Sequence, residues 1–159
     1  MIDHTNHYAR YDELMALAAK SSPSRRNDGG YMAALYILSA DPELYKIAGS
    51  KISQNGVNFR GLLCSVRKSE LSDSQIIAVH AAHSLFNGDG GNAATPSTLA
   101  LCDYSTLDIV TDAVYIWKGG RTPVAGENGC MYLDNSNEQR QRAFETAFDR
   151  LHAEDHNPA

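Results

Sequence analysis

The sequence predicts an all-α protein, a compact, bundle-like single domain of five to seven helices over residues 1–159. Three observations predict this fold class. Apolar residues recur at steps of three and four in several segments, which is the period of a helix with one buried face. Capping residues stand before these segments, and glycine stops follow them. The connections are short enough for one packed domain. The sequence allows one exception to the all-α class, a short strand near residues 131–133.

The first half of the chain holds four expected helices. The first is expected at residues 5–20, and an exposed loop at residues 21–30 follows it. The apolar run at residues 31–39 is interpreted as a buried central helix, with a strand as the alternative because a short apolar run does not define its own period. Asp41 is placed to cap the next, short helix. Residues 57–66 are expected to form the fourth helix.

Two capping-box patterns organise the second half. In residues 72–75 a serine hydroxyl and a glutamine amide can satisfy free backbone donors, which predicts a helix that ends at Gly88. Thr95 is expected to cap one further helical turn. The second pattern, residues 105–108, predicts a helix that ends at Gly119. The apolar stripe of this helix is expected to consist of Leu107, Val110, Val114 and Trp117.

The last helix is expected to begin at the Ser136-Asn-Glu-Gln139 pattern. Its apolar residues share one face, which we expect to pack inward while the charged residues face solvent. The inward residues are expected to be Ala143, Phe144, Ala147, Phe148 and Leu151. Residues from about 153 to 159 are expected to fray as a chain end.

Composition and charge exclude several classes of protein. No apolar stretch of about 18 residues occurs, which excludes a membrane-spanning helix, and the first residues do not have the form of a secretory signal. The three cysteines are scattered, as is typical of reduced thiols in a cytoplasmic protein. The net charge is −5, although residues 20–70 carry eight basic and four acidic side chains. This excess is too small to predict a nucleic-acid partner, but it suits a small anionic ligand.

The histidine pairs are the first candidates for metal binding. His80 and His83 stand at a spacing that can hold one metal ion on a helix, but the sequence offers no third and fourth ligand in a recognised pattern. His4 and His7 have the same spacing near the chain start. We therefore expect packed or exposed histidines, with no metal and no cofactor.

The remaining chemical patterns are also better explained by structure. The glycine-rich residues 87–92 and 119–123 do not end as a phosphate-binding loop does, so they are interpreted as helix stops. Asp108 and Asp112, one helical turn apart, are interpreted as a solvated helix face. No serine or cysteine stands in a nucleophile pattern. These absences favour a binding protein over an enzyme, without deciding between them.

A collection of residues suggests a site for a nucleotide-like anion. Basic and polar side chains stand just before the helix expected near Tyr31, and a helix N-terminus beside guanidinium groups binds anions. Aromatic side chains supply surfaces on which a base can stack. Two further cations flank the second glycine turn. The expected ligand-binding residues are Arg25, Arg26, Asn27, Tyr31, Tyr36, Trp117, Lys118 and Arg121.

The segment Ala33–Tyr45 contains Tyr-Ile-Leu-Ser followed by an acidic helix with Leu-Tyr, and it resembles a family of small bacterial and phage helical proteins. The His7–Leu14 stretch and Ser84–Gly88 resemble further landmarks of that family. The resemblance covers about the first 120 residues and implies a helical fold, with no catalytic residues to carry over. The association with phages implies a protein that counters host defence.

Three functional hypotheses follow. The leading one is a non-enzymatic anti-defence protein that sequesters a nucleotide-derived immune signal, either ADP-ribose-like or a cyclic dinucleotide, in a pocket that a homo-oligomer can form between subunits. The second is a protein-interaction inhibitor that binds a host defence enzyme through its acidic second half. The third is a hydrolase of such a signal, in which His80 and His83 take part.

Overall fold

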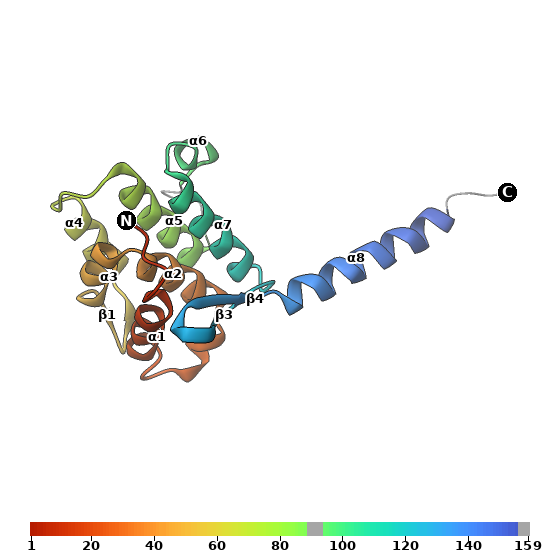
Figure 1. Ribbon diagram of the computed structural model, residues 1–159, viewed down its shortest axis with the longest axis horizontal. Coiled ribbons are helices and arrows are strands. Elements are labelled where there is room, and N and C mark those ends of the chain that lie inside the picture. The colour runs from red at the N-terminus through yellow and green to blue at the C-terminus, as the bar shows by residue number, and fades with distance from the viewer. Residues whose placement is uncertain (89–93, 156–159) are drawn as a thin grey trace.

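The computed structural model describes residues 1–88 and 94–155. Helices dominate this part of the chain, and two short hairpins and two 3-10 turns connect them (Figure 1). In chain order the elements are α1 (His7–Ala18), η1 (Pro23–Asn27), α2 (Gly29–Ala40), α3 (Pro42–Gly49), β1 (Ile52–Ser53), β2 (Gly56–Val57), α4 (Phe59–Val66), α5 (Asp73–Asn87), α6 (Pro96–Leu99), α7 (Tyr104–Trp117), β3 (Thr122–Ala125), η2 (Glu127–Gly129), β4 (Met131–Asp134) and α8 (Ser136–Asp155).

The predicted helical class is confirmed in its main feature. The described residues hold eight α-helices, one above the expected range, because the four-residue turn α6 is counted among them. Two antiparallel two-stranded sheets add a small strand component that an all-α description leaves out. None of the helices described is both long enough and apolar enough to cross a membrane.

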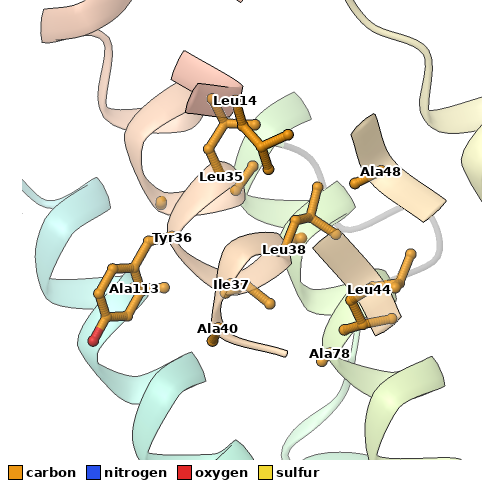
Figure 2. Close-up of a cluster of buried hydrophobic side chains, with 14 of the residues drawn as sticks. Leu14, Leu35, Tyr36, Ile37, Leu38, Ala40, Leu44, Ala48, Ala78 and Ala113 are labelled. Carbon is orange, nitrogen blue, oxygen red and sulfur yellow. The ribbon is translucent and has the colours of Figure 1, made fainter. Parts of the chain in front are cut away.

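Helix α2 is the centre of the fold. Its residues 33–40 are all buried, which confirms the central helix expected from the apolar run. Helices α1, α3, α5 and α7 all contact α2. Figure 2 shows side chains of α2, including Leu35 and Leu38, among Leu14, Leu44 and Ala78 from neighbouring helices. Because residues 33–40 are buried and four helices contact α2, this helix lies at the centre of the hydrophobic core.

Three of the expected helix caps are present as predicted. The Asp41 carboxylate accepts hydrogen bonds from the backbone N–H groups of Glu43 and Leu44 at the start of α3. Ser72 and Gln75 form the reciprocal capping box that opens α5. Thr95 caps α6, and α5 ends at a left-handed glycine with φ of 66°. These local interactions satisfy backbone groups that the helix itself leaves free.

Helix α7 begins two residues before the expected start, and its buried face lies one position earlier than expected. Asp103, not Ser105, caps the helix, because its carboxylate accepts the N–H of Thr106 at 2.8 Å. Val114 and Trp117 are exposed although both were expected inside. The face turned toward α2 and α5 lies one position earlier along the helix. The buried residues of α7 are Thr106, Ile109, Val110, Ala113 and Ile116.

The expected strand near residues 131–133 exists as β4, and it pairs antiparallel with β3. Thr122 lies opposite Asp134 and Ala125 opposite Met131, and the turn between the strands includes Asn128 with φ of 61°. The sequence predicted neither β3 nor the β1–β2 hairpin. Strands of two to four residues are too short to show an alternating pattern.

Helix α8 projects away from the body (Figure 1). Its first turn is held by a hydrogen bond from the Glu138 N–H to the carbonyl oxygen of Gly120, 2.9 Å long. From residue 139 to residue 153 every side chain is exposed. The expectation that the apolar face of this helix packs inward was therefore wrong, because the β3–β4 hairpin turns the chain away from the core before the helix begins. Residues from about 153 to 159 were expected to fray, but α8 continues to Asp155, and residues 156–159 lie outside the described residues.

Candidate functional site

The structure divides the eight expected ligand-binding residues between two places. One group surrounds the point where α2 begins and α7 ends. A Cβ atom added at Gly29 would lie 2.8 Å from the carbonyl oxygen of Trp117, so the two helix ends are in close contact and the absence of a side chain at Gly29 permits it. The other group, Tyr36 and Arg121, meets at Asp112 on the side of α7.

In the first group, the guanidinium groups of both arginines already bind other groups of the protein. Arg25 donates hydrogen bonds to the carbonyl oxygens of Ala18 and Gln54, at 2.7 and 2.8 Å. Its guanidinium group also lies over the ring of Tyr31, 5.2 Å from the ring centroid. Arg26 forms an exposed ion pair with Asp12 at 3.2 Å. These contacts fix the η1 segment to α1 and to the β1–β2 hairpin.

The N-terminus of α2 carries an acidic cap. Asp28 accepts the backbone N–H of Tyr31 at 2.9 Å, and α2 begins at Gly29, two residues before the expected start. A carboxylate therefore occupies part of the helix end where an anionic ligand was expected. Asn27 and Lys118 are exposed beside this end.

The second group forms a network of charged and polar side chains. Arg121 donates to the carboxylates of Asp112 and Glu138, at 2.5 and 2.8 Å, and lies over the ring of Tyr115. The hydrogen bond to Glu138 raises the pKa of Arg121 above its ordinary value. The Tyr36 hydroxyl donates to Asp112 at 3.3 Å, and burial of the ring raises the pKa of this tyrosine. Two carboxylates thus already balance the cation that was expected to meet a phosphate.

A cavity of about 330 Å³ lies beside this network. His4 and His7 line it from the start of the chain, Tyr36 from α2, and Asp108 and Asp112 from α7. Its lining, within the described residues, holds two carboxylates and neither lysine nor arginine, which disfavours an anionic ligand. The sequence showed Asp108 and Asp112 as a pair, but it gave no signal that residues near the chain start would lie across from them.

His7 is the buried polar residue of this region, with an exposed fraction of 1%. Its Nε2 lies 2.9 Å from the carbonyl oxygen of Tyr36, which can only accept, so Nε2 carries the proton and donates. Burial lowers the pKa of His7 to about 4. His7 is therefore a neutral structural residue near pH 7, and Nδ1 has no partner among the described residues.

The other candidate metal and phosphate patterns have structural roles. The His83 ring packs against Phe59 and lies 2.8 Å from the Asn87 amide nitrogen. Within the described residues no group of three or more potential ligands is placed to hold a metal ion. Gly119, with φ of 82°, takes the left-handed conformation that ends α7. The glycine-rich segment at 87–92 falls mostly outside the described residues.

The apolar stripe of α8, which was expected to lie inside, is an exposed surface. The stripe consists of Phe144, Phe148 and Leu151, whose exposed fractions are 72%, 51% and 65%. The two phenylalanine rings stack with their centroids 6.4 Å apart, so they point to the same side of the helix. Clustered exposed apolar residues, unlike scattered ones, mark surfaces that bind proteins or other ligands.

Comparison of the chain with protein-family models, with curated proteins and with solved structures gives no match. The candidate sites therefore rest on the geometry of this chain alone. Two surfaces remain as candidates, the α8 stripe and the junction of the α2 and α7 ends.

Proposed function

We propose that this chain is a non-enzymatic binding protein that contacts another protein through the α8 stripe. The observation that carries the proposal is that three large apolar side chains, Phe144, Phe148 and Leu151, lie on a helix that leaves the body. Fully burying one such side chain is worth about 1.5–3 kcal/mol, so three of them provide a substantial driving force for association. Helices with this kind of stripe bind in grooves or pair with other helices.

The form of this function suggested by the resemblance to phage proteins is inhibition of a host defence enzyme. In that case helix α8 supplies the contact, and not the acidic second half of the chain as a whole. Nothing in this role requires a cofactor, a metal or a catalytic group.

Photo-crosslinking in cells tests the proposed contact. A benzoylphenylalanine in place of Phe148 keeps an aromatic ring in the stripe, while the same group at Thr146 points from the opposite side of α8. We expect several-fold more protein adduct from position 148 than from position 146, because only the stripe is covered by a partner. Equal or absent adducts at the two positions would contradict the proposal.

A second candidate function is sequestration of a nucleotide-like ligand at the junction of α2 and α7. The observation that favours it is the stacked pair of Arg25 and Tyr31 beside the end of α7, where the Trp117 side chain is 48% exposed. An aromatic ring and a guanidinium group can hold a base and a phosphate of one ligand. This candidate requires Arg25 to exchange a carbonyl contact for the phosphate.

Thermal unfolding with ADP-ribose and with cyclic dinucleotides tests this second candidate. A ligand at about 100 times its Kd stabilises a protein by about 2.7 kcal/mol, which corresponds to a rise in Tm of about 5–10 °C for a chain of this size. We expect Trp117→Ala to reduce the rise and Tyr104→Ala, at the other end of α7, to leave it unchanged. An unaltered Tm with every ligand would remove this candidate.

A further inference from the structure

The α8 stripe has the spacing of a helix-pairing seam. Phe144, Phe148 and Leu151 follow one another at steps of four and three, which are the steps of the inner positions of a coiled coil. Continued toward the body, the same steps reach Gln141 and Asn137. The seam is therefore apolar in its outer half and polar near the body.

Two oppositely charged residues flank the seam at the spacing of an interhelical ion pair. Arg140 and Glu145 stand five residues apart on its two sides, and neither takes part in an ion pair within the described residues. In a parallel, in-register pair of helices these are the two flanking positions, one residue before and one after the inner positions, that face each other across the interface. Each copy would therefore supply one cation and one anion to the pair.

The apolar half of the seam is not covered by the described part of the body. Arg121 and the Gly120 carbonyl hold Glu138 at the base of α8, and the residues of α8 that line the hollow against the end of α7 are Glu138, Gln141, Arg142 and Glu145. Gln141 and Glu145 therefore lie at the border between this hollow and the seam, whereas Phe144, Phe148 and Leu151 are not among the lining residues. A partner outside the chain is needed to bury them.

We propose that α8 pairs in parallel and in register with α8 of a second copy of this chain. This inference rests on the proposed role of the α8 stripe in protein contact, and it identifies the partner. Phe144, Phe148 and Leu151 of each copy pack against the same residues of the other, and the two Gln141 amides can hydrogen-bond to one another near the body. Arg140 of each copy meets Glu145 of the other, so the interface holds two ion pairs.

The charge pattern distinguishes this arrangement from the antiparallel one. In an antiparallel pair the flank of α8 that carries Glu145 faces the Glu145 flank of the other copy, so Arg140 does not lie opposite Glu145. In the parallel pair each Glu145 has an arginine opposite. The parallel pair therefore gives each of these two charges a partner of opposite sign, and the antiparallel pair does not.

Sedimentation equilibrium over a concentration series tests the pairing. We expect a monomer–dimer equilibrium for the full chain and a monomer for Phe148→Glu, which places a charge in the seam. Glu145→Arg is expected to weaken the dimer roughly tenfold, because two attractive pairs become repulsive. The double change Arg140→Glu with Glu145→Arg is expected to restore the affinity. Asp149→Arg, the same change of charge outside the seam, serves as the control and should have little effect.

Cysteine cross-linking tests the orientation. In a background with Cys64, Cys102 and Cys130 replaced by serine, Gln141→Cys is expected to form a disulfide-linked dimer, because inner positions of a parallel pair lie next to their own copies. Gln139→Cys, on the outer face, is the matched control and should remain unlinked. A dimer that forms no disulfide in the Gln141→Cys variant, and in which Glu145→Gln strengthens association, would overturn the parallel arrangement.

The outcomes separate this inference from the proposed function. A chain that stays monomeric at every concentration, but crosslinks from position 148 to a different protein, overturns the self-pairing and supports the α8 contact. A monomer with no stripe-dependent adduct overturns both. An adduct of twice the mass of the chain from position 148, lost when Phe144→Glu is added to the same chain, supports both.

Discussion

Replacing Leu38 by alanine is expected to lower the free energy of unfolding by about 3 kcal/mol. Leu38 has no exposed surface and lies in α2, which the other core helices surround. The truncation loses the transfer free energy of the removed carbons, and it leaves a cavity that helices packed on several sides cannot easily close. The corresponding fall in Tm is about 6–12 °C for a chain of this length.

Urea unfolding followed by circular dichroism measures this loss. Leu101→Ala is the matched control, because the same truncation at a side chain that is 72% exposed should change the stability by less than about 0.5 kcal/mol. Similar losses for the two variants would mean that α2 is not the centre of the core.

Acidification from pH 6.5 to pH 4 is expected to remove about 3 kcal/mol of stability through His7. The unfolded chain binds a proton at this histidine below about pH 6.5, whereas burial delays protonation of the folded chain until about pH 4. Protons therefore favour the unfolded state throughout this window. The stability contributed by the neutral histidine is complete above the window and decreases as the pH falls through it.

A comparison with His7→Gln isolates this contribution. The glutamine amide can still donate to the carbonyl oxygen of Tyr36, but it does not titrate. We expect the dependence of the free energy of unfolding on pH to be flatter in the variant between pH 4 and 6.5. His80, whose pKa burial also lowers, changes stability in the same direction in both proteins and cancels in the difference. Identical slopes would show that His7 is protonated without cost in the folded protein.

Features determined within a few residues were predictable from the sequence. The Asp41, Ser72 and Thr95 caps each bond to backbone groups two or three positions away, so the local pattern contains the whole interaction. The central position of α2 followed from a run of apolar residues with no polar face. At α7, Asp103 and Ser105 are both able to cap a helix, and the sequence pattern alone favoured the wrong one.

Features that depend on distant residues were not predictable. An amphipathic pattern shows that a helix has an apolar face, but it does not identify what covers that face, and the α8 stripe was therefore placed inside. Arg121 looked like a free cation beside a glycine turn. Its partners, Asp112 and Glu138, stand nine residues before it and 17 after it and belong to different helices. The ligand-binding role expected for this residue remains a prediction.

The contacts of Arg121 have a mechanical consequence for α8. A helix joined to a body only through its backbone can swing about the connecting residues, so the far end of a helix of 20 residues, about 30 Å long, would sweep a wide cone. Arg121 ties the base of α8 sideways to Asp112 as well, through Glu138. The Arg121 side chain thereby restricts the angle between α8 and the body. This angle determines how far from the body a partner bound to α8 is held.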